Sequence, residues 1–183
     1  MLCNRQKVNK MDKGKKLKKG WATQIKSLIS YVLLFLVIGW GVDLWRAQSL
    51  VSGKAPELIA TTVQGEKIDL LAMSEEKPVL VYFWATWCGV CSTVSPSVDF
   101  IHDNYQVVTV ALNSGSNKRI KQYLAAKDYD FSVVSDPKGL VSRDWGISVT
   151  PTFFVVNKGE VSSITTGFTS PFGLWGRLLL ARF

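Results

Sequence analysis

Cysteine and histidine, the usual ligands of a structural zinc ion, are scarce in this sequence. The 183-residue chain has three cysteines and one histidine, His102. A zinc site built on the closely spaced Cys88 and Cys91 would need two further ligands, and the chain offers only Cys3 and His102. The composition therefore argues against zinc and leaves the Cys88–Cys91 pair to be explained in another way.

Net charge is lacking in the larger part of the chain, although the whole chain carries +8. Residues 1–26 hold nine of the 22 basic residues and one of the 14 acidic ones, so the rest of the chain holds 13 of each. A neutral body offers no electrostatic footprint for DNA or RNA. We therefore expect no nucleic-acid partner, and we read residues 1–26 as a basic tail.

Charged residues are absent from 27–42, and most side chains in that stretch are large and apolar. Trp40 and Trp45 close the stretch, as aromatic residues do at membrane interfaces. No Ala-x-Ala pattern follows, which favours an uncleaved anchor over a cleaved signal peptide. We expect a transmembrane signal anchor at 27–45, with the basic tail on the cytoplasmic side.

This topology predicts a single-pass protein of the bacterial inner membrane, with a cytoplasmic N-terminus and a periplasmic domain. We expect a linker at 46–54 and one domain at 55–183. Cys3 would stay in the reducing cytoplasm, away from Cys88 and Cys91 in an oxidising compartment. A three-residue spacing closes too small a loop to stabilise a fold much, so the pair indicates a working dithiol.

Apolar patterning within the domain predicts strands that alternate with helices. The continuous apolar run 79–84 is typical of a central strand covered on both faces. Alternating strands and helices, followed by a terminal hairpin and helix, predict an α/β domain with a mixed sheet. The expected strands are a hairpin over 58–70 and runs at 79–84, 106–112, 131–134, 152–156 and 160–166. One expected helix follows the cysteines and is kinked at Pro96, and the others occupy 120–124, 140–145 and 171–183. In the last helix, Leu174, Leu178 and Leu179 are expected to point inward.

The two cysteines follow the central strand directly and open the next helix. Thiols at positions i and i+3 of a helix lie on one side and can form a disulfide after small adjustments. The positive end of the helix favours the thiolate of Cys88, and predicts a pKa moderately below the ~8.5 of a free thiol. A redox dithiol and transient Cu(I) binding by two soft ligands both remain open at this point.

Three landmarks together resemble thioredoxin-fold proteins. The segment 83–91, which reads Phe-Trp-Ala-Thr-Trp-Cys-Gly-Val-Cys, resembles the active-site segment of that family. Pro96 stands where the family kinks its first active-site helix, and 149–152 resembles its cis-proline loop. An extra helix and strand between residues 113 and 134 is similar to the insertion of the membrane-anchored TlpA/ResA class. Within that class, the anchor, the Trp-Cys-Gly-Val-Cys pattern and the segment 95–98 most resemble the suppressor-for-copper-sensitivity D proteins.

The resemblance implies a fold and an activity. The fold would be a thioredoxin fold, a mixed central sheet flanked by helices, with an N-terminal hairpin and a central insertion, preceded by one transmembrane helix. The activity would be thiol–disulfide exchange with cysteine-containing protein substrates, without a cofactor or metal, fed by a transmembrane electron-donor protein. Cys88 would attack and Cys91 would resolve the mixed disulfide, while Trp87, Thr150 and Pro151 would bind the substrate.

Two positions depart from the family pattern. Many thioredoxins carry a buried acid where this chain has Tyr82, and cytochrome-c-maturation members usually carry a glutamate where it has Val94. The leading hypothesis is a periplasmic reductase of protein disulfides, with a role in copper tolerance. The alternatives are a disulfide-forming oxidant, a cytochrome c maturation thioredoxin, and a copper-binding or chaperone-like module.

Overall fold

The computed structural model describes residues 30–31, 34 and 51–182. The chain divides into two units, 1–47 and 48–183, and the account below concerns the second. The predicted tail at 1–26, almost all of the predicted anchor at 27–45 and the linker up to residue 50 lie outside the described residues. Among the residues that are described, no helix has the length and apolar character needed to cross a membrane.

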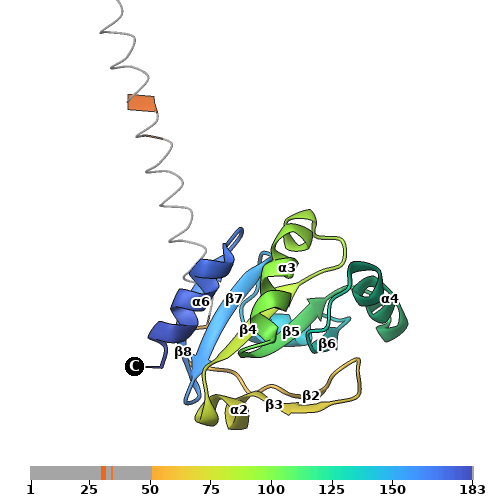
Figure 1. Cartoon of the computed structure of the whole chain (residues 1–183), viewed down its shortest axis with the longest axis horizontal. Coiled ribbons are helices and arrows are strands. Elements are labelled where there is room, and N and C mark those ends of the chain that lie inside the picture. Colours follow the sequence, from red (N-terminus) through yellow and green to blue (C-terminus); the bar gives the residue numbers. More distant parts are fainter. Residues whose placement is uncertain (1–29, 32–33, 35–50, 183) are drawn as a thin grey trace, which may run out of the picture. The chain divides into compact units, whose positions relative to one another are not determined.

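A six-stranded sheet forms the centre of the domain, with strand β4 (Val79–Trp84) inside it (Figure 1). The strand order is β1-β8-β7-β4-β5-β6. β4 pairs in parallel with β5 and antiparallel with β7, so the sheet is mixed, as the sequence predicts. The other strands of this sheet are β1 (Gly53–Lys54), β5 (Gln106–Leu112), β6 (Val133–Asp136), β7 (Thr152–Asn157) and β8 (Glu160–Thr166).

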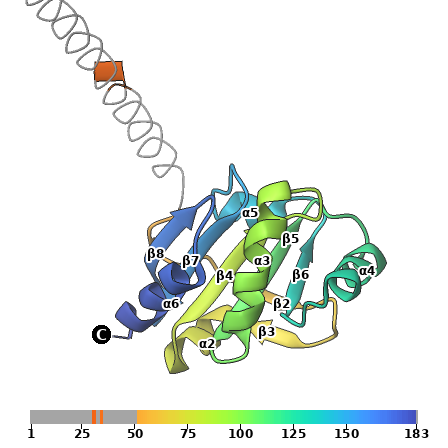
Figure 2. The ribbon, with the colours of Figure 1, turned by 45° about the horizontal axis from the view of Figure 1, so that its top comes forward.

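Helices cover both faces of the sheet (Figure 2). On one face lie α3 (Gly89–His102), α4 (Asn117–Lys127) and α6 (Pro171–Leu180), which share one apolar core. On the other face lie α2 (Leu70–Glu76), α5 (Leu140–Asp144) and a separate hairpin of β2 (Ile59–Thr61) and β3 (Lys67–Asp69).

The continuous apolar run of β4 is explained by these two cores. Successive side chains of a strand point to opposite faces, so each face of a covered strand needs its own apolar set. Leu80, Tyr82 and Trp84 enter the core under α3, α4 and α6, and the intervening residues enter the other core. All six residues of β4 are buried.

Two short elements were absent from the sequence prediction. Helix α2 begins at Leu70, where the prediction extended a strand, and the Asp69 carboxylate caps it by accepting the N–H of Ala72 at 3.1 Å. Strand β1 lies inside the predicted linker and pairs antiparallel with the start of β8. Both elements have too few residues to show a periodic pattern. Helix α2 has a local signal in its Asp69 cap, whereas β1 is defined by its pairing with β8.

Two other elements differ in detail. Strand β6 begins at Val133 and ends at Asp136, whose buried carboxylate accepts the N–H groups of Leu140 and Ser142 at the start of α5, each at 2.8 Å. In α6, Leu174 and Leu178 are fully buried as predicted, but Leu179 is only half-buried. The predicted helix and strand between residues 113 and 134 correspond to α4 and β6.

We expect Trp145 to be essential for the stability of the domain. Its buried ring packs against Phe83 and Phe154, with centroid distances of 5.5 and 4.8 Å. Trp145→Ala should lower the free energy of unfolding by about 3–5 kcal/mol, because a large cavity remains. Leu140→Ala, at an exposed site nearby, should change it by less than about 0.5 kcal/mol. Urea denaturation of both variants measures the free energy of unfolding. An equal decrease in the two variants would contradict the importance of the Trp145 packing.

Candidate active site

The first cysteine of the pair caps helix α3. β4 ends at Trp84, and Cys88 takes the N-cap position of α3, where its Sγ accepts the N–H of Cys91 at 3.1 Å. This N–H group would be without a partner in an uncapped helix. A backbone donor aimed at sulfur also favours negative charge there once the disulfide is reduced.

The two sulfur atoms are joined but differ in exposure. Cys88 and Cys91 form a disulfide with an S–S distance of 2.09 Å and a Cα–Cα distance of 5.2 Å. Cys88 is 8% exposed and Cys91 is 0% exposed. Cys88 therefore keeps a small exposed area that a substrate could approach, whereas Cys91 has none.

The loop before β7 lies beside the disulfide. The Thr150–Pro151 peptide bond is cis, and the carbonyl oxygen of Thr150 lies 3.7 Å from Sγ of Cys88. The Pro151 carbonyl accepts the N–H of Gly167 at 2.8 Å, which holds the loop against the chain that follows β8. Thr150 and Pro151, more than sixty residues away in sequence, thus lie next to the cysteine pair.

Trp87 lies on the surface directly before Cys88. Its side chain is 63% exposed, and its Nε1–H donates to the carbonyl oxygen of Asn113 at 3.1 Å. Trp87 is therefore a surface residue and belongs to neither core. Val90, between the cysteines, is also exposed, so the rim of the disulfide on this side is apolar.

A pair of hydroxyl groups lies behind the disulfide. The Tyr82 hydroxyl is 3.1 Å from Oγ of Ser95 and 3.5 Å from the carbonyl oxygen of Cys91. Burial raises the pKa of Tyr82 above its ordinary value, so the phenol stays protonated and cannot act as a base near neutral pH. Val94 is fully buried. At both positions where this chain departs from the family pattern, Tyr82 and Val94, the buried side chain is therefore uncharged.

Ser95 is the residue of this site that the sequence analysis missed. It lies four residues after Cys91 in α3, and this spacing places both on one face of a helix. Its sequence spacing was visible, but its partner was not, because Tyr82 comes from a different element. Only the packing of α3 on β4 brings the two hydroxyl groups together.

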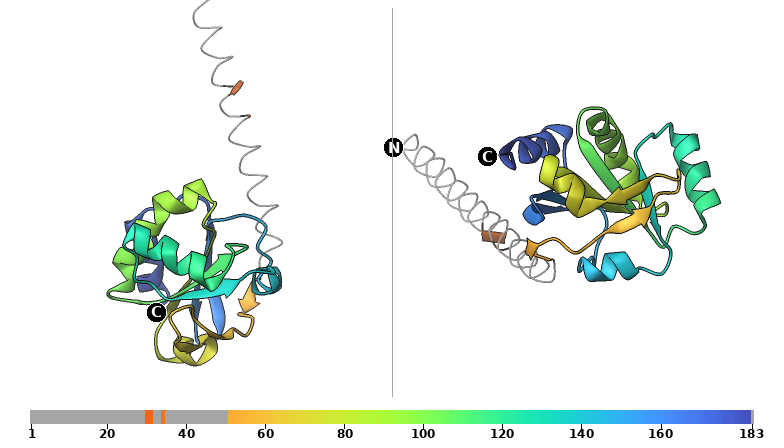
Figure 3. Two further views of the ribbon diagram at one scale, coloured as in Figure 1. Left: turned by 90° about the vertical axis from the view of Figure 1, so that its right-hand side faces the viewer. Right: turned by 90° about the horizontal axis from the view of Figure 1, so that it is seen from below.

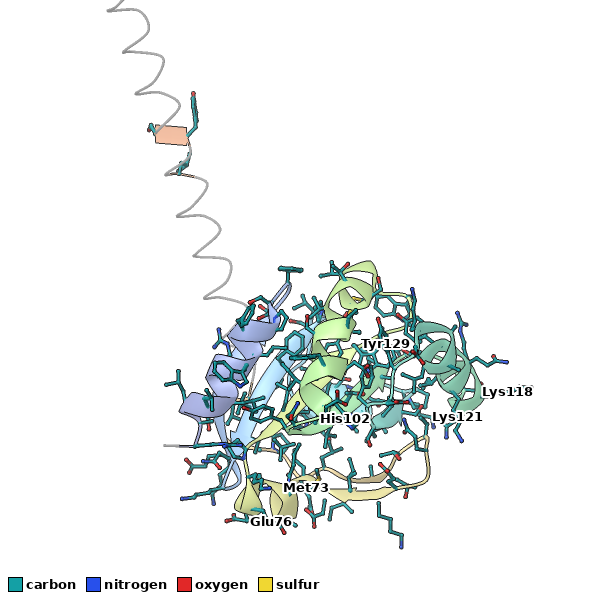
Figure 4. The ribbon with its side chains drawn as sticks, viewed as in Figure 1. Met73, Glu76, His102, Lys118, Lys121 and Tyr129 are labelled. Atoms are coloured by element: carbon teal, nitrogen blue, oxygen red, sulfur yellow. A yellow bond between two sulfur atoms is a disulfide. The ribbon has the colours of Figure 1, made fainter. Side chains whose placement is uncertain are left out.

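The site offers no set of metal ligands beyond the two sulfur atoms. Within residues 51–182, no three side chains of histidine, cysteine, aspartate or glutamate gather at one place. His102 stands at the last position of α3, at the opposite end of the helix from Cys88 (Figure 4). The chemistry available at this end of the sheet is therefore that of a dithiol and its disulfide.

Comparison with known proteins agrees with this geometry. Residues 51–164 match the AhpC/TSA family. A thioredoxin-like protein of Haemophilus influenzae is 39% identical over 160 residues, which cover 87% of this chain and 95% of that protein. The thiol-disulfide oxidoreductase ResA of Bacillus cereus is 27% identical, covering 72% of this chain and 82% of that one.

Solved structures give the same result. A putative thiol:disulfide interchange protein DsbE from Chlorobium tepidum superposes with a TM-score of 0.62 at 29% identity, covering 72% of this chain and 98% of that chain. StoA from Bacillus subtilis superposes with a TM-score of 0.60 at 25% identity, covering 67% and 96%.

The fold and the disulfide at the start of α3 define a thioredoxin-like thiol–disulfide oxidoreductase, an enzyme of the ResA/DsbE type. The chain belongs to the AhpC/TSA family. The individual roles of Cys88, Cys91, Trp87, Thr150 and Pro151 stay predictions.

We predict that Tyr82 makes the domain sensitive to alkali. Since its pKa is raised by burial, its stabilising contribution is complete below the unfolded value of ~10 and falls as pH rises above it, by up to ~1.4 kcal/mol per pH unit. Tyr82→Phe should flatten this dependence, whereas Ser95→Ala removes the hydrogen bond but keeps the phenol and the slope. Urea denaturation between pH 8 and pH 11 gives the comparison. An unchanged slope in Tyr82→Phe would contradict it.

Proposed function

We propose that this chain is a membrane-tethered periplasmic reductase of protein disulfides that acts through Cys88 and Cys91. The observation that carries the proposal is the difference between the two sulfur atoms. Cys88 is the more exposed of the two, at 8% against 0%; its sulfur accepts the N–H of Cys91 and lies next to the Thr150 carbonyl. The attacking thiol must be reached by the substrate disulfide, whereas the resolving thiol needs to reach only the sulfur of the attacking cysteine.

The exchange proceeds in two steps. The Cys88 thiolate attacks one sulfur of a substrate disulfide, the substrate S–S bond breaks, and the leaving thiolate takes up a proton. Cys91 loses its proton and attacks Cys88, which releases the second substrate thiol and leaves the Cys88–Cys91 disulfide. Two electrons thus pass from the enzyme to the substrate, and the final enzyme state is the one in the structure.

The loop at Thr150 and the exposed Trp87 provide a place for the substrate chain. The Thr150 carbonyl oxygen lies 3.7 Å from the Cys88 sulfur, so an extended peptide that hydrogen-bonds to this loop would bring its own sulfur close to Cys88. Pro151 has no N–H to compete for that position. The aromatic face of Trp87 and the side chain of Val90 would cover the neighbouring apolar residues of the substrate.

The periplasmic location and the direction of electron flow rest on sequence features. The basic residues of 1–26 and the uncharged stretch 27–42 support an anchor with the domain on the far side of the membrane. A reductase in an oxidising compartment must be reduced again after each turnover, so it requires a donor that carries electrons across the membrane. Gly89 and Val90 place no charged side chain between the cysteines to stabilise the thiolate further, which favours a reductant over a strong oxidant.

The role in copper tolerance belongs to the same proposal. It rests on the resemblance of residues 87–91 and 95–98 to the copper-sensitivity proteins. In that role the enzyme would repair disulfides formed when copper oxidises periplasmic thiols. Disulfide exchange is favoured over a copper-binding module because the two sulfur atoms have no third cysteine, histidine or carboxylate gathered with them in the domain described.

We expect Cys91→Ser to accumulate mixed disulfides with protein substrates, because the second step is removed. The matched control is Cys88→Ser, which should accumulate none, since the remaining thiol is buried. Both variants carry Cys3→Ser, so that no other cysteine remains. Non-reducing gels of acid-quenched cells give the measurement. Adducts that form with Cys88→Ser instead would reverse the two roles, and no adducts with either would favour a binding module.

We further expect Cys88 and Cys91 to be reduced and accessible from outside the inner membrane. Spheroplasts treated with a membrane-impermeant maleimide should be labelled at Cys88 without lysis or added reductant. Cys3 provides an internal control, because it should be labelled only after lysis. Labelling of Cys88 that requires a reductant would indicate an oxidase, and labelling that requires lysis would contradict the periplasmic location.

A further inference from the structure

Two loops meet at the end of the sheet where the disulfide lies. Strands β4 and β5 are parallel, so their carboxyl ends share one edge of the sheet. The helices that follow them, α3 and α4, lie on one face of the sheet, and α5 lies on the other (Figure 3). The pairing of the two strands ends where Trp84 lies opposite Ala111. Beyond it, the active-site turn at 85–88 and the loop at 113–116 continue as neighbours.

A buried serine joins the two loops. Ser114 is 2% exposed, and its Oγ accepts the N–H of Thr86 at 3.0 Å and donates to the carbonyl oxygen of Leu112, also at 3.0 Å. In a continued parallel ladder this N–H would bond directly to the Leu112 carbonyl, because Thr86 would lie opposite Asn113. The serine hydroxyl therefore stands between these two groups and sets the distance at which the active-site turn leaves β5.

The main chain of the same loop holds the ring of Trp87. The Trp87 Nε1–H donates to the carbonyl oxygen of Asn113 at 3.1 Å, although the side chain is 63% exposed. Asn113 itself adopts the left-handed conformation, with a φ of 45°, which asparagine tolerates better than most residues. Its N–H donates to the carbonyl oxygen of Asp136 on β6 at 3.0 Å. The loop is thus attached to β6 on one side and to the active-site turn on the other.

The attacking cysteine is held by other bonds. The N–H of Cys88 donates to the carbonyl oxygen of Ala85 at 3.1 Å, and its Sγ accepts an N–H from within α3. Thr86 and Trp87 occupy the two central positions of the turn that the first of these bonds closes. Ser114 therefore contacts the part of the turn that carries Trp87, and takes no part in the bonds that hold the Cys88 sulfur.

We propose that Ser114 is a positioning residue, whose hydroxyl holds the active-site turn so that the ring of Trp87 is fixed in orientation before a substrate binds. This rests on the proposed contact of Trp87 with the substrate. Thr86 directly precedes Trp87, so a shift of its N–H would move the indole away from the Asn113 carbonyl. A surface ring that is free to rotate loses entropy when a substrate immobilises it, and a ring that is already held avoids that cost. Ser114 thus acts on substrate binding and not on the chemistry of the sulfur.

Indole ¹⁵N NMR of the full chain in detergent micelles tests the positioning directly. Trp87→Phe identifies the Trp87 signal among those of the seven tryptophans. In the wild type, the Trp87 indole N–H should exchange with water several-fold more slowly than that of free tryptophan, because it is hydrogen-bonded. Ser114→Ala should remove most of this protection. Ser116→Ala is the matched control, since it removes an exposed hydroxyl of the same loop that caps α4, and it should leave the protection unchanged.

Reduction of insulin disulfides, with dithiothreitol as the electron donor, measures the effect on substrate binding. Ser114→Ala should raise the KM for insulin by roughly threefold to tenfold and leave kcat unchanged, because the lost interaction is equal in the ground state and the transition state. The rate with bis(2-hydroxyethyl) disulfide, which is too small to cover the Trp87 ring, should stay the same and shows that the variant is folded. The pH dependence of Cys88 alkylation should also stay the same.

A double variant tests whether Ser114 acts through Trp87. In a Trp87→Ala background, Ser114→Ala should raise the KM no further, since the side chain that it positions is gone. A further increase of equal size would overturn the proposal, as would rapid indole exchange in the wild type or full protection in Ser114→Ala. If neither single variant changes the KM while Ser114→Ala loses the indole protection, the positioning by Ser114 is upheld and the proposed contact of Trp87 with substrate fails.

Discussion

The need to cover strand β4 on both faces governs the rest of this structure. All six of its side chains are buried, and they alternate between two separate cores. A strand that contributes side chains to both cores has to be covered on both faces, so β4 lies inside the sheet with helices packed on each face. Its carboxyl end therefore opens into α3 at the rim of the sheet, and this rim is where Cys88 and Cys91 lie. The location of the chemistry follows from the demands of packing.

Strand register then assembles the rest of the site. β7 runs antiparallel to β4, and Phe83 pairs with Thr152, so the chain just before β7 lies beside the chain just after β4. This pairing places Thr150 and Pro151 against the Cys88 sulfur, although they are distant in sequence. The carboxyl end of β4 thus leads to the reactive sulfur, and the adjacent amino end of β7 follows the loop that we propose receives the substrate. Small changes of register would separate them.

The surroundings of the two cysteines set them apart from each other. Cys88 keeps 8% of its surface exposed and has a backbone N–H directed at its sulfur, while Cys91 is fully buried and its carbonyl oxygen lies 3.5 Å from the Tyr82 hydroxyl. Burial keeps the phenol of Tyr82 protonated, so the two side-chain groups that lie behind Cys91 are neutral hydroxyls. At the far end of α3, aromatic residues on α3 and α6 form a surface that the domain itself leaves uncovered.

By itself, the sequence determined the elements whose pattern is local: the strands 79–84 and 106–112, the helix that starts at the cysteines, and the pairing of Cys88 with Cys91. Continuous apolar runs and an i, i+3 spacing carry that information without reference to distant residues. Tertiary structure decided the rest. Strand β1 exists through its pairing with β8, and Ser95 finds its hydrogen-bond partner in Tyr82. Leu174 and Leu179 were both expected to point inward from α6, yet only packing decides that Leu174 is fully buried and Leu179 half-buried.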